Sequence, residues 1–290
     1  DKTKAIFLPN KMAYPPRYVI DRPACETGCS ECVEACKYGA IDLDMKTQEI
    51  ELEVSSVVVA TGWKPYDASK LTNMGFSSVP NVINNIMMER LASVSGPTKG
   101  KILRPSDQKP VESVVFVQCA GSRDENHLPY CSSICCLGSL KHAKYVLEQN
   151  PEAKVHIFYI DIRTPGKYED FVVKVQAEPN VNMIKGKVAK IVAGKDGGVM
   201  VEAEDILKFG KVHLEVDMVV LATGMESSLK GQAQVAGITL DEYGFVPVEL
   251  QQHGIFSAGV AHRRCRRTCT ADWTALLISP AGSLLGPGKL

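Results

Sequence analysis

Ten cysteines are the residues of this 290-residue chain with the most evident chemistry. Thiolates bind iron–sulfur clusters and zinc, and they exchange disulfides. Eight of them form two quartets, which are Cys25, Cys29, Cys32 and Cys36, and Cys119, Cys131, Cys135 and Cys136. The N-terminus has no apolar signal region, so such tight clusters favour metal or redox cofactors over a disulfide framework.

The first quartet, CETGCSECVEAC, has gaps of three, two and three residues. Bacterial ferredoxins use gaps of two, two and three, followed by a proline. Here Gly28 accounts for the inserted residue, and Lys37 stands in place of the proline. We expect a [4Fe-4S] cluster, with a structural zinc site as the alternative. The fourth cysteine of a two-cluster ferredoxin serves the other cluster, which leaves the partners of Cys36 open.

The second quartet lies in CAGSRDENHLPYCSSICC, with gaps of eleven, three and zero. Adjacent Cys135 and Cys136 are unusual ligands for one zinc ion, because neighbouring side chains at a helix start diverge. A cubane cluster is larger, and a helix N-terminus favours its negative charge. We expect a second cluster; redox-active thiols and plain buried cysteines are the alternatives. Arg123 and Lys141 are expected as cationic neighbours that raise its potential, whereas His127 is not predicted to be a ligand.

Alternating strands and helices must position this second quartet. The run 113–118 reads as a buried strand, and its loop leads to a helix at about 134–149. Further elements are expected at 154–162 (strand), about 168–177 (helix), 181–192 (strand) and 198–203 (strand). Such units form parallel sheets of the α/β class. Thiolates then occupy the place where a nicotinamide-binding module keeps its glycine-rich cradle, which argues against NAD(P)H and for electron transfer between proteins.

Two strands end in Ala-Thr-Gly, and a third apolar stretch ends in Ala-Gly-Val. These endings resemble segments that contact FAD in flavoproteins with two dinucleotide-binding domains. The expected cofactor-binding residues are Ala60, Thr61, Gly62, Ala222, Thr223, Gly224, Gly259 and Val260. Val260 stands where such flavoproteins have an acid. The chain has no GxGxxG motif, so we expect the first FAD-binding unit to lie upstream of Asp1.

The cysteine loop with its flanking Ala-Thr-Gly turns resembles the HdrA-type flavoproteins of heterodisulfide reductases. Segments 1–21 and 41–67 look closer still to the A subunit of the quinone-interacting membrane-bound oxidoreductase (Qmo) complex of sulfate reducers, and the resemblance covers roughly residues 1–261. It implies a thioredoxin-reductase-like two-dinucleotide-domain flavoprotein, N-terminally incomplete, with a ferredoxin-like cysteine insertion. It also implies FAD, and a [4Fe-4S] cluster on Cys119, Cys131, Cys135 and Cys136.

The resemblance further implies a redox subunit that links a membrane quinone pool to adenylylsulfate reductase in dissimilatory sulfate reduction. Its partners would be other subunits of a membrane-associated complex. The alternatives are a pyridine-nucleotide-dependent thiol reductase that uses Cys135 and Cys136, and a zinc-stapled assembly module. No catalytic residue is assigned.

The composition excludes some other classes of function. The chain has 33 Lys and Arg residues and 33 Asp and Glu residues, so its net charge does not favour binding to nucleic acid or to an anionic membrane. No apolar run approaches the roughly 20 residues of a membrane span, so we expect a cytoplasmic protein that reaches the membrane through its partners.

The expected division of the chain has five parts. They are an irregular segment with the first quartet (1–48), a return to the FAD domain with a linker (49–112), a second dinucleotide-domain-like module (113–212), the C-terminal part of the FAD domain (213–261) and an atypical tail (262–290). Cys265 and Cys269 in the tail are assigned no role.

Overall fold

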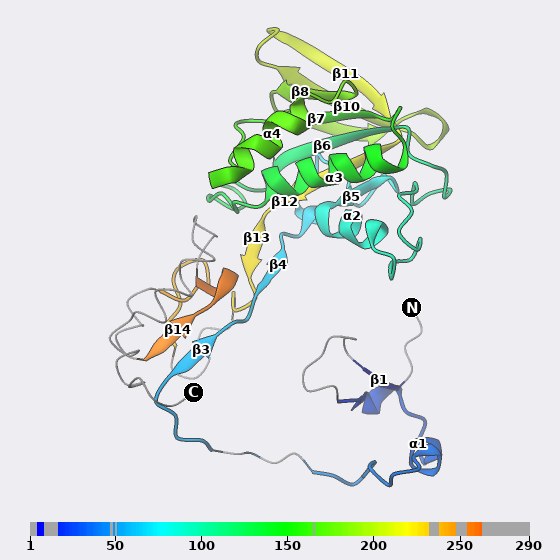
Figure 1. Cartoon of the computed structure of the whole chain (residues 1–290), viewed down its shortest axis with the longest axis vertical. Helices are drawn as coiled ribbons and strands as arrows, with labels where there is room; N and C mark the ends of the chain where they lie inside the picture. Colours follow the sequence, from blue (N-terminus) through cyan, green and yellow to red (C-terminus); the bar gives the residue numbers. More distant parts are fainter. Residues whose placement is uncertain are drawn as a thin grey trace. The chain divides into compact units, whose positions relative to one another are not determined.

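The structure is a computed structural model that describes residues 5–8, 17–46, 49, 51–164, 166–231, 238–247 and 254–262. The chain divides into two units, 1–54 and 55–290 (Figure 1). Of the expected tail, only His262 is among the described residues, so Cys265 and Cys269 lie outside them.

The first unit holds little regular structure. Strands β1 (Ile6–Phe7) and β2 (Val19–Ile20) pair antiparallel, and they are followed by the 3-10 helix η1 (Arg22–Ala24) and the short helix α1 (Glu31–Ala35). None of its described residues is buried. Units this small rarely bury enough apolar surface to fold by that means alone, and natural examples use metals or disulfides.

The second unit is built on a five-stranded parallel sheet of order β5-β12-β6-β7-β8. The strands are β5 (Val82–Asn84), β12 (Met218–Thr223), β6 (Ser113–Ala120), β7 (Lys154–Tyr159) and β8 (Val181–Lys185). This sheet confirms the predicted α/β class. Strand β12 lies between β5 and β6, although it was expected in a separate FAD part; all six of its residues are buried, which suits a central strand of a parallel sheet.

Helices cover one face of this sheet. They are α2 (Asn85–Ala92), α3 (Cys135–Gln149) and α4 (Glu169–Gln176). The apolar residues of the helices pack on alternate strand residues such as Val114 and Phe116 of β6. Because successive strand side chains point to opposite faces, Val115 and Val117 belong to the core on the other side. Each such fully buried side chain contributes about 1.5–3 kcal/mol to stability.

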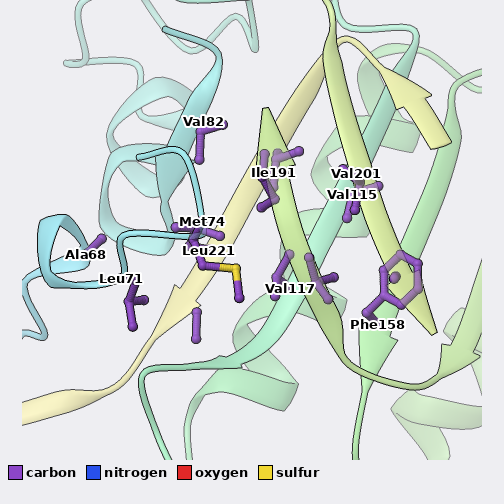
Figure 2. Close-up of a cluster of buried hydrophobic side chains, with 14 of the residues drawn as sticks. Ala68, Leu71, Met74, Val82, Val115, Val117, Phe158, Ile191, Val201 and Leu221 are labelled. Carbon is purple, nitrogen blue, oxygen red and sulfur yellow. The ribbon is translucent and has the colours of Figure 1, made fainter. Parts of the chain in front are cut away.

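An antiparallel three-stranded sheet covers the opposite face. It consists of β9 (Val188–Ala193), β10 (Val199–Asp205) and β11 (Gly210–Val216). Figure 2 shows Ile191 and Val201 of this layer close to Val115, Val117 and Phe158 of the parallel sheet. The single strand expected at 181–192 is therefore two strands in different sheets. The chain changes sheets at Gly186, where a Cβ would lie 1.7 Å from the Glu204 carbonyl oxygen.

Two further strand pairs complete the described part of the second unit. Strands β3 (Val57–Val59) and β14 (Ile255–Ser257) pair in parallel, and β4 (Trp63–Pro65) pairs antiparallel with β13 (Met225–Ser227). The 3-10 helices are η2 (Ala68–Lys70), η3 (Gly166–Tyr168), η4 (Lys195–Gly197) and η6 (Gly259–His262). Among the described residues, no helix has the length and apolarity needed to cross a membrane.

Candidate functional site

The loop between β6 and α3 is tightly wound. Cys119, Arg123 and Ser133 have φ angles of 55°, 59° and 61°, in the left-handed region that side chains other than glycine rarely adopt. The Leu128 N–H donates to the Gly121 carbonyl at 2.9 Å, which folds the loop back on itself. This reversal brings the second half of the loop beside the first, so residues distant in the loop meet at its base.

The four cysteines of the second quartet meet in one small pocket. Cys119, Cys131, Cys135 and Cys136 line it, and the remaining lining residues are Ser122, Arg123, Ser132, Ser133, Asp161 and Arg163. Cys135 and Cys136 are buried at the start of α3, whereas Cys119 and Cys131 are half-buried. The structure therefore gathers all four thiols that the sequence singled out, from both ends of the loop.

The surroundings of these thiols disfavour free thiolates. Burial, helped by the neighbouring Cys136 and Cys131, raises the pKa of Cys119 to about 11. Burial is also the main cause of the raised pKa of Cys135 and of Cys136. Four thiolates so close together repel one another, and positively charged iron bound among them would offset that repulsion. The donor set thus fits an iron–sulfur cluster.

Main-chain groups around the pocket point at its sulfur atoms. The N–H groups of Ser133 and Arg163 donate to Cys131 Sγ and Cys136 Sγ, each at 3.4 Å. Hydrogen bonds to ligand sulfurs are one of the means by which proteins tune iron–sulfur clusters. The pocket therefore has sulfur-directed donors from two separate segments of the chain.

The cations beside the pocket differ in part from those expected. Arg123 lines the pocket as predicted and forms an ion pair with Asp161. Lys141 instead pairs with Glu89 and lies over the Tyr145 ring. Arg163 also lines the pocket, although no sequence motif pointed to it. Its position just beyond β7, the strand next to β6, is a signal that could have identified it, because adjacent parallel strands end at the same sheet edge.

The second Ala-Thr-Gly turn packs beneath the cysteine loop. Cys135 Sγ lies 3.6 Å from the Thr223 carbonyl oxygen, and the Met225 N–H donates to Ser132 Oγ at 2.8 Å. Ala222 and Thr223 are buried, and Gly224 is in close contact with the loop. The structure thus packs Ala222, Thr223 and Gly224 against the cysteine loop that carries the thiol pocket.

The first Ala-Thr-Gly turn lies beside the last predicted flavin segment. Strands β3 and β14 are parallel neighbours, and the Ala258 N–H donates to the Val59 carbonyl at 2.9 Å. Ala60, Thr61 and Gly62 follow β3 directly, and Gly259 and Val260 follow β14. Ligands of α/β proteins bind at such carboxyl ends of parallel strands. These five residues are therefore together, and Ala60, Thr61 and Gly259 are exposed.

The first quartet lies on the short loop and helix of the first unit. Cys25 directly follows η1, Cys29 is exposed, and Cys32 and Cys36 lie in and directly after α1. The Ala40 N–H donates to Cys36 Sγ at 3.4 Å, and this bond is the main reason that the pKa of Cys36 is lowered. All eight quartet cysteines are free thiols, and no three or more His, Cys, Asp or Glu side chains among the described residues are spaced to hold a single metal ion.

Comparison with known proteins shows homologues over most or all of the chain. It is 36% identical over 301 residues to the A subunit of the ferredoxin:CoB-CoM heterodisulfide reductase of Methanosarcina mazei, which covers 100% of this chain and 38% of that protein. It is 37% identical over 271 residues to the iron-sulfur A subunit of the CoB–CoM heterodisulfide reductase of Methanocaldococcus jannaschii, covering 89% of this chain and 41% of that protein. The chain thus spans about two fifths of these relatives. No protein-family model matches it.

Solved structures give more distant likenesses. Thioredoxin reductase of Lactococcus lactis matches 74% of this chain and 60% of its own, with 15% identity and a TM-score of 0.46. Thioredoxin reductase of T. acidophilum matches the same shares with 17% identity and a TM-score of 0.43.

Proposed function

We propose that this chain, a homologue of the A subunits of CoB–CoM heterodisulfide reductases, forms the iron–sulfur-carrying part of a flavin-containing electron-transfer subunit. The relatives are named as subunits, which supports a role within a multi-subunit oxidoreductase. Because the chain covers about two fifths of each relative, FAD retention and partner binding by this chain are part of the proposal.

The observation that carries this proposal is the pocket of four thiols at the carboxyl edge of the parallel sheet. A bound [4Fe-4S] cluster would supply one-electron transfer there. Cys119, Cys131, Cys135 and Cys136 would hold it, and the wound loop would bring these four ligands together. Cys25, Cys29, Cys32 and Cys36 are proposed to hold a second cluster in the first unit.

FAD is proposed to bind at the carboxyl ends of β3 and β14. The first Ala-Thr-Gly turn, with exposed Ala60 and Thr61, and the adjacent exposed Gly259 support this place, because they leave main-chain groups accessible to a nucleotide. Gly62 and Val260 complete the proposed site. The buried turn at Ala222, Thr223 and Gly224 is not included, since it packs on the cysteine loop.

The physiological partners are proposed from the sequence resemblance in 1–21 and 41–67. The protein would exchange electrons between a membrane quinone pool and adenylylsulfate reductase, and it would reach the membrane through other subunits. To test this, a reduced quinone analogue is added to the assembled complex, and adenylylsulfate reductase with its substrate is added afterwards. The redox state of the clusters is followed throughout. Cluster reduction and then reoxidation are expected; reoxidation by CoB–CoM heterodisulfide alone would instead indicate the reaction of the named relatives.

The central experiment measures iron, sulfide and flavin in anaerobically purified protein. Two clusters correspond to about eight iron atoms per chain. Cys136→Ser should remove about half of the iron, and Cys32→Ser should remove the other half. Absence of iron from the wild-type protein would refute the proposal, and an unchanged iron content in Cys136→Ser would refute the assigned ligands.

The rival function, a pyridine-nucleotide-dependent thiol reductase, receives less support. Its exchanging pair would be Cys135 and Cys136, but burial raises the pKa of both thiols. Because the thiolate is the attacking species, such thiols react slowly near neutral pH. A yellow protein that NADPH bleaches, without iron, would favour the rival.

A further inference from the structure

Two arginines flank the thiol pocket from different segments of the chain, and one carboxylate holds both. Arg123 lies in the cysteine loop, and Arg163 lies beyond β7. Arg123 Nη1 pairs with Asp161 Oδ1, while Arg163 Nε and Nη2 contact Asp161 Oδ2 at 3.3 and 3.2 Å. Asp161 therefore links the segment after β7 to the cysteine loop through its contacts with Arg163 and Arg123.

These three residues determine the fixed charge around the pocket. Among the described residues they are the charged side chains of its lining, apart from the cysteines themselves. Two guanidiniums and one carboxylate leave a net charge of +1. Arg123 is the more buried of the two arginines, with 23% of its side chain exposed against 49% for Arg163, so solvent screens its charge less.

We propose that Arg123 and Arg163 raise the reduction potential of the cluster held by the second quartet, and that Asp161 positions them. This inference rests on the proposed function, since it requires that cluster. On reduction the cluster accepts one electron from a reduced flavin or a one-electron protein carrier. No bond forms or breaks, and the negative charge grows by one. A neighbouring positive charge therefore stabilises the reduced form more than the oxidised form.

Replacing the Arg163 side chain tests this charge effect while the main-chain contact with the cysteine site is kept. The Arg163 main-chain N–H donates to Cys136 Sγ at 3.4 Å, and a side-chain substitution leaves that donor in place. Half of the side chain is exposed, so its loss creates no large cavity. Arg163→Gln removes the charge, whereas Arg163→Lys retains it.

The test is an anaerobic redox titration of the iron-loaded full chain, followed by EPR, on wild type, Arg163→Gln, Arg163→Lys and Arg123→Gln. The signal that disappears in Cys136→Ser identifies the relevant cluster. At the wild-type midpoint potential, each glutamine variant should lower the ratio of reduced to oxidised cluster about tenfold, which corresponds to about 59 mV for one electron. Arg163→Lys keeps the positive charge, so its midpoint potential should stay close to that of the wild type.

Arg90→Gln on α2 serves as the matched control, because Arg90 is exposed and lies outside the pocket lining. It should leave the potential unchanged. Unchanged potentials in both pocket variants, or an equal shift in Arg90→Gln, would overturn the inference while leaving the cluster assignment intact. Loss of iron with an unchanged potential of the remaining clusters would show a structural role and would also overturn it. A wild-type protein without iron would instead refute the proposed function and this inference with it.

Discussion

The carbonyl oxygen of Thr223 lies 3.6 Å from Cys135 Sγ, so the end of β12 packs directly against a cysteine of the thiol pocket. Thr223 is fully buried, and its hydroxyl donates to Asn85 Oδ1 at 3.0 Å, at the start of α2. The cysteine site is thereby connected to the interior strand β12 and to the helix α2. Changes in this turn should affect both the stability of the fold and the cysteine site.

Gly224→Ala tests this connection. An added Cβ would lie 2.1 Å from Ser122 Oγ, 2.6 Å from Leu128 Cδ1 and 2.9 Å from Ser132 Oγ, so the cysteine loop would have to move. Overpacking of this kind costs about 1–3 kcal/mol. We expect the free energy of unfolding in urea to fall by that amount and the iron content to decrease.

Gly138→Ala is the control for this substitution. Gly138 lies inside α3, and its added Cβ would meet no atom within 4 Å. Alanine in a helix interior is favoured over glycine by about 0.5–1 kcal/mol, so this variant should be slightly more stable. A Gly224→Ala protein as stable as wild type would contradict the close packing of the turn on the loop.

Tyr66→Phe should loosen the cysteine loop without unfolding the protein. The Tyr66 hydroxyl and His127 Nδ1 are 2.8 Å apart, and the Tyr66 ring fills the space next to Gly121. Phenylalanine keeps the ring and loses the hydrogen bond, at a cost of about 0.5–1.5 kcal/mol. Hydrogen exchange of the loop amides should become faster. Tyr168→Phe, at an exposed tyrosine, should leave the exchange unchanged.

The buried His142 side chain should make the folded protein less stable in mild acid. Burial is the main cause of the lowered pKa of His142, and the positive charge of Lys141 lowers it further. The hydrogen bond with Glu89 raises the pKa, but by less than burial lowers it. Below about pH 6.5 the unfolded chain therefore binds more protons at this residue than the folded chain. The free energy of unfolding should fall as the pH decreases through this range.

Urea unfolding measured at several pH values from about 7.5 to about 5.5, which span the ordinary pKa of histidine, tests this dependence. His142→Gln should flatten it in part; burial also lowers the pKa of His156, so some dependence should remain. His213→Gln, at an exposed position, should leave the slope as in wild type. Equal slopes in all three proteins would refute the prediction.

Cysteines of the two quartets should differ in their rates of alkylation in the reduced, metal-free protein. Cys29 is exposed, whereas Cys135 is 7% exposed and its pKa is raised by burial. Iodoacetamide should modify Cys29 at least about tenfold faster, because the thiolate is the reacting species. Peptide mass spectrometry measures both rates. Unfolding in urea should make them similar, and equal rates in the folded protein would contradict the buried position of Cys135.

Much of the fold followed from local sequence patterns. The apolar run at 113–118, the helix expected at about 134–149 and the strand that follows predicted an α/β module, because alternating strands and helices of this length form parallel sheets. The predicted strand at 181–192 was wrong in one respect, since Gly186 divides it between two sheets. That change depends on contact with Glu204, which local pattern does not contain.

The sequence by itself singled out the residues that are proposed to carry the chemistry of this protein. The spacing of Cys119, Cys131, Cys135 and Cys136 within one loop made them a set, since thiols on one loop can meet without knowledge of the rest of the fold. Tertiary structure alone decided what surrounds them. Arg163 follows β7 and Thr223 ends β12, the two strands on either side of β6. Lys141 is directed instead to Glu89. Strand order creates these neighbours, and strand order follows from the packing of the whole sheet rather than from any single segment.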